Sequence, residues 1–61
     1  MFTAQKKFEN GHEETEDFAT YEEACKWLAT SPEAGINMFA GDNDELPDFG
    51  QIQSDVEYWQ Q

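Results

Sequence analysis

The dipeptide Asn10-Gly11 constrains the fold of this chain more than any other feature, because it lies between two segments of strand-like sequence. Asn-Gly is a strong signal for a β-hairpin turn, since both residues tolerate the left-handed backbone conformation. We therefore expect residues 2–8 and 12–18 to form two antiparallel strands. A two-residue loop would place Phe2 and Phe18 on opposite faces of the hairpin, whereas a three-residue loop pairs them directly.

The three-residue loop, residues 9–11, also gives better cross-strand neighbours, because it brings lysines opposite glutamates. Gly11 then takes the left-handed position of a bulged turn. We predict this register. In this register Lys7–Glu13 and Lys6–Glu14 are ion pairs and Phe2–Phe18 is an aromatic pair. The pair Phe8–His12 closes the loop.

The segment after the hairpin carries the signals of a helix. Thr20 is followed three residues later by Glu23, which is the spacing of a capping box. Glu22 and Lys26 are spaced for an i, i+4 ion pair on the solvent side. Ser31-Pro32 predicts the end of this helix. The apolar face with helical spacing consists of Tyr21, Ala24, Cys25 and Leu28, flanked by Trp27.

The last third of the sequence predicts two more strands. Residues 36–40 are short and apolar, which favours a central strand. Residues 41–50 are rich in acidic and turn residues and include Pro47, which favours a loop. Residues 51–59 alternate between Ile52, Val56 and Tyr58 on one side and polar residues on the other, which favours a strand. The expected fold is therefore α+β, in the order ββαββ, with one helix packed on a small antiparallel sheet.

The length of 61 residues allows one domain, residues 1–61. A domain of this size buries only about 60% of the surface that its unfolded chain exposes, so a few large side chains supply the core. The chain has nine aromatic residues, which argue against the full disorder that its charge alone would suggest. The side chains expected to be largely buried are Phe18, Cys25, Tyr21, Leu28, Ile36 and Phe39.

Charge is the strongest functional signal. The chain has 14 Asp and Glu against 3 Lys and Arg, a formal net charge of −11. Such an excess repels nucleic acid and anionic membranes and attracts basic surfaces. We therefore expect a partner of basic character, such as a DNA-binding protein or nuclease of a host. Direct binding of nucleic acid or membrane is not expected, and a homodimer is compatible with the sequence.

The acidic residues fall into clusters along the chain. Alternate residues on a strand lie about 6.6–6.8 Å apart, and phosphates of one DNA strand are spaced about 3.4 Å along the helix axis and farther apart along the curved backbone itself. Clustered carboxylates on a twisted hairpin and at a helix start can therefore imitate a row of phosphates. The candidate partner-binding residues are Glu13, Glu14, Glu16, Asp17, Glu22, Glu23, Asp42, Asp44, Glu45, Asp48, Asp55 and Glu57.

Other kinds of site find little support, so we expect neither enzyme activity nor a cofactor. Residues 42–45 resemble the start of a calcium loop, but Pro47 and Gln53 occupy the positions of its glycine and its last glutamate. A chain this short hardly forms a pocket that would separate the pKa values of two carboxylates. The single histidine, His12, has no second histidine for a zinc site and no nucleophile beside it.

Cysteine content and hydropathy favour the cytoplasm of a host cell. Cys25 is the single cysteine, which excludes an internal disulfide and a multi-cysteine zinc site, and a reduced, buried thiol fits the cytoplasm. The first residues contain no apolar run typical of a signal peptide. No segment approaches the roughly 18 apolar residues that a membrane span requires.

Several short motifs recur in the order known from one family. They are Phe8-Glu9-Asn10-Gly11, Glu16-Asp17-Phe18, Tyr21-Glu22-Glu23-Ala24-Cys25, Pro32-Glu33, Met38-Phe39 and Asp44-Glu45-Leu46-Pro47. With these motifs, residues 8–50 resemble the N-terminal part of ArdA-type antirestriction proteins. The resemblance implies an acidic protein that imitates the shape and charge of DNA and blocks type I restriction-modification enzymes. Members of that family are longer, with further domains and a dimer interface, and a Trp expected in the second strand is absent here.

Two hypotheses follow from the sequence. The first is an inhibitor of phage or plasmid type that occupies the basic DNA-binding groove of a host enzyme, such as a restriction-modification enzyme or a CRISPR effector. The second is an acidic interaction module that binds a partner, unrelated to DNA, through its helix and an aromatic surface containing Trp27 or Trp59.

Overall fold

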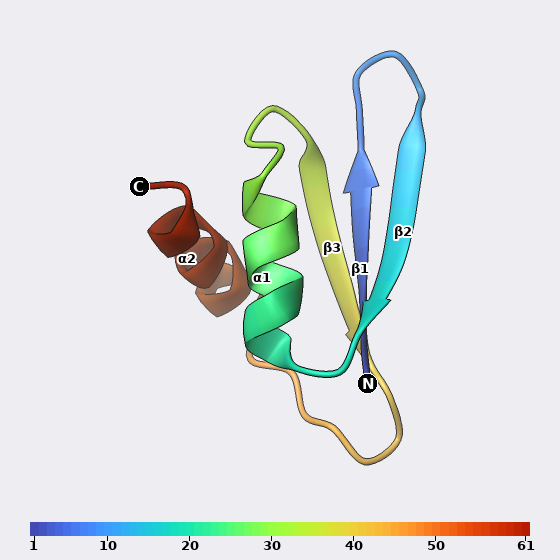
Figure 1. Ribbon diagram of the computed structural model, residues 1–61, viewed down its shortest axis with the longest axis vertical. Coiled ribbons are helices and arrows are strands. Elements are labelled where there is room, and N and C mark those ends of the chain that lie inside the picture. Colours follow the sequence, from blue (N-terminus) through green and yellow to red (C-terminus); the bar gives the residue numbers. More distant parts are fainter.

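The computed structural model describes all residues from 1 to 61 and has the order ββαβα (Figure 1). A three-stranded antiparallel sheet has the strand order β2-β1-β3, with β1 at its centre. The elements are β1 (Phe2–Lys7), β2 (Glu13–Phe18), α1 (Tyr21–Ala29), β3 (Gly35–Ala40) and α2 (Phe49–Trp59). The α+β class is thus confirmed. Neither helix is long and apolar enough to cross a membrane.

The hairpin has the predicted register. Phe2 pairs with Phe18, and the ladder runs without interruption to the pair of Lys7 with Glu13. The Phe8 N–H donates to the carbonyl of His12 at 2.8 Å, which closes the three-residue loop. Gly11 has φ +90°, a conformation that strains residues with a Cβ, so the glycine of the turn is required by the backbone.

The first helix also starts and packs as predicted. The Thr20 hydroxyl oxygen accepts the Glu23 N–H at 3.2 Å, which caps α1 at its first turn. Lys26 lies 3.4 Å from the Glu22 carboxylate, as the i, i+4 spacing indicates. The buried residues of this helix are Ala24, Cys25 and Leu28.

The third strand is at an edge of the sheet, so the prediction of a central strand for residues 36–40 was wrong. β1 is central because its residues pair on both sides, as when Phe2 pairs with both Phe18 and Ala40. After β2, the chain crosses the sheet through α1 and returns parallel to β2, on the far side of β1. A helical crossover of this kind is the usual connection between parallel strands, and here β1 lies between them.

The last element is a helix, so the predicted fourth strand at residues 51–59 was wrong and the ββαββ order is replaced by ββαβα. Phe49, Ile52, Val56 and Trp59 are separated by three, four and three residues, which is helical spacing. Asp48 caps this helix by accepting the Gln51 N–H at 2.9 Å. The alternation through Ile52, Val56 and Tyr58 had no apolar residue at position 54, where a strand would require one. The fold therefore has two helices instead of one, and α2 lies beside α1 (Figure 1).

The core lies between the helices and one face of the sheet. Its eight buried apolar residues are Phe2, Ala4, Ala24, Cys25, Leu28, Met38, Ile52 and Val56. Leu28 and Cys25 are buried as predicted, while Phe18, Tyr21 and Ile36 are half-buried. Phe39 is 52% exposed, against the prediction. Because side chains alternate along a strand, Met38 points to the helices and Phe39 to the open face of the sheet.

A buried lysine lies on the same face of the sheet as the core. Lys6 is 2% exposed, and its ammonium donates to the hydroxyls of Thr30 at 2.8 Å and Ser31 at 3.0 Å. The ammonium also lies 4.1 Å from the centre of the Trp27 ring. The Lys6–Glu14 and Lys7–Glu13 neighbours are in register but form no ion pair within 4 Å, contrary to the prediction. The end of α1 offers Lys6 nearer partners than β2 does.

Candidate partner-binding surface

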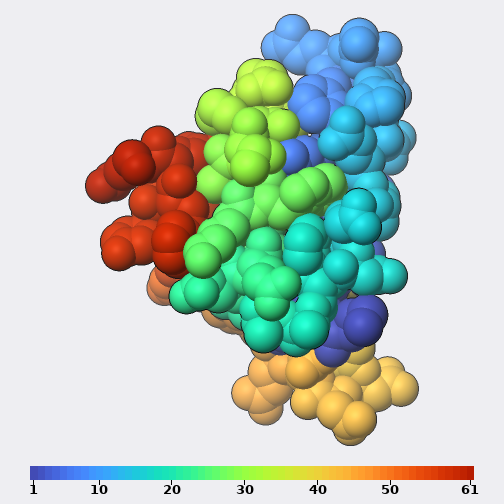
Figure 2. Space-filling model, in the orientation of Figure 1, coloured from blue at the N-terminus to red at the C-terminus, as the bar shows by residue number.

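Most of the candidate carboxylates gather at one end of the molecule. The pairs Phe2–Phe18 and Phe2–Ala40 show that β2 and β3, although they form opposite edges of the sheet, both finish at the same end of it. The first turn of α1 and the loop of residues 41–48 follow directly from these strand ends (Figures 1 and 2). We call this region the acidic end, and its eight carboxylates belong to Glu16, Asp17, Glu22, Glu23, Asp42, Asp44, Glu45 and Asp48.

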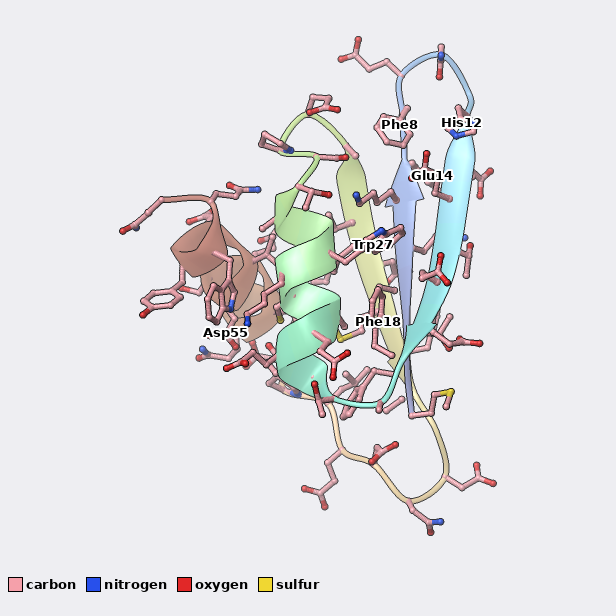
Figure 3. The ribbon with its side chains drawn as sticks, in the orientation of Figure 1. Phe8, His12, Glu14, Phe18, Trp27 and Asp55 are labelled. Carbon is pink, nitrogen blue, oxygen red and sulfur yellow. The ribbon has the colours of Figure 1, made fainter.

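Four candidate residues lie elsewhere. Glu13 and Glu14 are at the start of β2, beside the hairpin loop. Asp55 is half-buried where α2 meets α1 (Figure 3). Glu57 lines a hollow that it shares with Gly35, so it faces the opposite end of the sheet from the acidic end. The structure thus divides the twelve candidates into one concentrated group and four outlying residues.

Many of these carboxylates already have an intramolecular partner. Within the acidic end, the pairs are Asp17 with the Thr3 hydroxyl, Glu22 with Lys26, Glu23 with Thr20, Asp44 with the N-terminal amine, and Asp48 with the Gln51 N–H. Elsewhere, Glu14 lies 3.1 Å from the His12 ring and Glu13 accepts from Gln5. Three members of the acidic end, Glu16, Asp42 and Glu45, are exposed and contact no hydrogen-bond or ion-pair partner. No side-chain hydrogen bond or ion pair within the chain therefore accounts for these three carboxylates.

Some of the acidic residues lie on β2, at an exposed edge of the sheet, and have a different explanation. The hydrogen bond from the Phe8 N–H to His12 shows that even-numbered residues of β1 bond to β2, so Glu13, Thr15 and Asp17 turn their backbone groups outward. Charged side chains at such an edge discourage pairing with another strand. This role explains Glu13 and Asp17, but it does not explain the acidic residues of α1 or of the loop.

Basic groups do not offset the acidic end. Lys6 is buried, Lys26 is paired with Glu22, and Lys7 lies at the end of β1 opposite the acidic end. The N-terminal amine, paired with Asp44, and the Lys26 ammonium, paired with Glu22, are the two cations that face its eight carboxylates. The acidic end therefore holds eight of the 14 carboxylates of a molecule whose longest extent is 34 Å.

Aromatic side chains form a second surface feature, in the seam between the two helices. A groove of about 370 Å³ is lined by Tyr21, Glu22, Cys25, Asp55, Tyr58 and Trp59. Tyr58 and Trp59 are 66% and 38% exposed. Their rings pack edge to face, with 5.2 Å between the ring centres. Trp27, by contrast, packs against Phe18 at 5.6 Å and covers Lys6, so its role is structural (Figure 3). Because a strand was predicted for residues 51–59, this groove was not expected from the sequence. A predicted helix there would have indicated a surface between two helices.

Two groups lining the groove have shifted acid–base equilibria. Burial, assisted by the hydrogen bond to Asp55, raises the pKa of the Tyr21 hydroxyl above its ordinary value. Burial likewise raises the pKa of the Cys25 thiol, against a smaller opposing effect from Tyr21. Both groups thus stay protonated and uncharged at neutral pH. The Tyr21 hydroxyl donates to Asp55 at 2.5 Å and holds that carboxylate in place.

These shifts predict a loss of stability in alkali. A raised pKa in the folded state contributes stability that is complete below the unfolded pKa, about 8.5 for cysteine and 10 for tyrosine, and is lost above it. Burial lowers the pKa of Lys6, which acts in the opposite direction as pH rises. We therefore expect the unfolding free energy of the native chain, relative to Cys25→Ala, to fall by up to about 1.4 kcal/mol per pH unit above pH 8.5. Urea unfolding from pH 7 to 10 measures this difference, and a difference that does not change with pH would contradict the assignment.

The carboxylates do not converge on a single point. No group of three or more His, Cys, Asp or Glu side chains is arranged to hold a metal ion. The negative charge of the acidic end is thus spread over a surface rather than gathered into a chelating site. No known protein family, no curated protein and no solved structure matches this chain.

Proposed function

We propose that this protein is a DNA-mimicking inhibitor of phage or plasmid type, which occupies the basic DNA-binding groove of a host enzyme. The observation that carries the proposal is the acidic end: eight carboxylates from β2, α1 and the loop, with only two cations, the N-terminal amine and Lys26, paired to them. Three of these carboxylates have no partner within the chain, as expected of groups that serve an external cation. The inhibitor itself is not an enzyme in this proposal and acts in the host cytoplasm.

The size of the acidic end fits a short stretch of DNA backbone. Perpendicular to its longest axis, the molecule measures 23 by 17 Å. At about 3.4 Å per phosphate along the axis, one DNA strand carries about seven phosphates over the longer of these dimensions. The acidic end carries eight carboxylates, a number close to this count of phosphates. Lys and Arg side chains that are spaced for phosphates would meet negative charge at the acidic end.

The resemblance of residues 8–50 to ArdA-type proteins suggests a restriction-modification enzyme as the target. A chain of 61 residues covers less of a large enzyme than the longer members of that family would. A smaller basic groove, as in a CRISPR effector or a DNA-repair enzyme, is an alternative target of the same chemistry. Formation of a homodimer would double the available acidic surface.

The test is competition with DNA for one groove. We expect the tagged chain to capture a DNA-binding protein from a bacterial lysate at low salt and to release it at high salt. The purified partner should then lose a fluorescent duplex, measured by anisotropy, as unlabelled chain is added. The affinity of the chain for its partner should fall steeply as salt rises from about 50 to 200 mM. Salt screens the attraction between the carboxylates of the chain and the lysine and arginine side chains of the partner. A partner that binds the chain and duplex DNA together at low salt would overturn the proposal.

A second candidate function has its own observation. The exposed rings of Tyr58 and Trp59 give the helix seam the character of a protein-contact surface. An acidic interaction module that uses this seam would bind its partner without competing with DNA. Its binding would fall on replacement of Trp59 by Ala and would respond little to reversal of charge at the acidic end.

A further inference from the structure

We infer that the groove between α1 and α2 is a binding site for a guanidinium group, such as the side chain of an exposed arginine. The groove is formed by Tyr21, Glu22 and Cys25 of α1 and by Asp55, Tyr58 and Trp59 of α2. Its volume, about 370 Å³, is at the small end of the range of ligand sites, which suits one side chain better than a large ligand. The site is separate from the three free carboxylates of the acidic end.

The central group of the site is a carboxylate without a cation. Asp55 is half-buried, and its two oxygens accept one hydrogen bond each, from the Tyr21 hydroxyl at 2.5 Å and from the Gln51 amide at 2.9 Å. None of the three ion pairs of the chain includes Asp55. A carboxylate has about four acceptor positions, so both oxygens keep capacity for a further donor. Removing a carboxylate from water is costly unless a cation compensates, and Asp55 has none within the chain.

The walls of the groove suit a planar cation. Tyr58 and Trp59 are exposed and in edge contact, so ring faces remain available to a ligand. Cations bind to the negative face of an aromatic ring, and Trp binds them best. The floor is the buried Cys25, whose raised pKa keeps it an uncharged thiol. The six lining residues include no cation, and the one positive charge nearby is the Lys26 ammonium at the rim, over one face of the Trp59 ring.

One cation of the chain already shows this chemistry at the rim. The Lys26 ammonium lies 4.6 Å from the centre of the Trp59 ring and 3.4 Å from the Glu22 carboxylate. The lysine thus uses one aromatic wall and one carboxylate of the groove, while Asp55 and Tyr58 remain without a cation. A second cation would find the same pair of elements, a ring and a carboxylate, deeper in the seam.

Guanidinium fits this arrangement better than ammonium. It is planar, stacks on aromatic rings and is more weakly hydrated, so it loses less on entering a partly dry groove. Its parallel N–H groups can donate to both oxygens of one carboxylate, which matches the free positions of Asp55. The ligand class is therefore an arginine side chain on the surface of a basic partner.

The experiment uses a minimal probe, Nα-acetyl-arginine methylamide, with the neutral isostere Nα-acetyl-citrulline methylamide as control. We expect the arginine probe to shift the NMR ring signals of Tyr58 and Trp59 saturably, with a dissociation constant of about 1 mM. The citrulline probe should cause no saturable shift. Equal binding of both probes, or shifts confined to the acidic end, would overturn the assignment.

Variants locate the site. Trp59 lies near the end of α2, outside the core, so the fold should tolerate Trp59→Leu. This variant should weaken binding of the arginine probe about three- to tenfold. Asp55→Asn keeps an acceptor for the Tyr21 hydroxyl and should weaken it at least about fivefold. Glu57→Gln removes the same charge from the other side of α2 and should leave binding unchanged. Unchanged binding in both groove variants would refute the site.

The outcome separates this inference from the proposed function. Saturable arginine binding in a chain that fails to displace DNA from any captured partner would refute the DNA mimic and retain the groove. DNA displacement without arginine binding in the seam would do the reverse.

Discussion

Replacing Leu28 with Ala should remove roughly half of the stability of this protein. Leu28 is fully buried and belongs to the face of α1 that packs on the sheet and on α2. A Leu→Ala change at such a site costs about 2–5 kcal/mol, from lost transfer energy and from the cavity that remains. A domain of this length has a total stability of about 3–9 kcal/mol, at the usual 0.05–0.15 kcal/mol per residue. Urea unfolding followed by circular dichroism would measure the loss.

The chain offers a matched control for this change. Leu46, its other leucine, lies in the loop and is only half-buried against the core. Leu46→Ala removes the same atoms from a site that solvent already reaches, so it should cost clearly less than Leu28→Ala. Equal losses in the two variants would mean that the core is not centred on α1 as described.

The hairpin and the first helix could be predicted because their signals are local. The positive φ of Gly11 and the capping of α1 by Thr20 depend on residues within a few positions in sequence. Pairing of Phe2 with Phe18 then follows from the length of the loop, since one register alone puts both rings on one face. In these segments local preference and tertiary packing agree.

The later elements could not be predicted in the same way, because they depend on distant parts of the chain. The segment 51–59 alternates at three positions, which suggested a strand, but Ile52 and Val56 are also one helical turn apart. Asp48 carried the missed signal, an N-cap directly after Pro47. Phe39 was expected to be buried because its short apolar run suggested a central strand, whereas β3 is at an edge and Phe39 points to the open face of the sheet.

The candidate surface shows the same division. Sequence clusters identified the acidic residues, but only the strand order brings Glu16 near the loop of residues 41–48 and separates Glu57 from it. The register of the hairpin also shows which carboxylates are unsuitable for a charge-reversal experiment. Glu13 and Glu14 lie opposite Lys7 and Lys6, so lysine at either position would place like charges across the hairpin and disturb the fold.

Under the proposed function, reversing the three free carboxylates of the acidic end should remove most of the inhibition. The variant Glu16→Lys, Asp42→Lys, Glu45→Lys changes only exposed side chains without intramolecular partners, so the fold should persist. A single neutralisation should cost little, because exposed ion pairs contribute only about 0–1 kcal/mol each. Three reversals together replace attraction by repulsion and should raise the concentration needed to displace duplex DNA at least about a hundredfold. Anisotropy competition measures the loss, and circular dichroism checks the fold.

The control keeps the net charge and moves its position. Glu9→Lys, Glu33→Lys, Glu57→Lys also reverses three exposed carboxylates, but at the hairpin loop, after α1 and on α2. Both variants have the same formal net charge, so a nonspecific effect of total charge would weaken them equally. A local array at the acidic end instead predicts that the control keeps most of its potency. Comparable loss in the two variants would show that inhibition depends on net charge and not on a phosphate-like arrangement, and that result would decide against DNA mimicry.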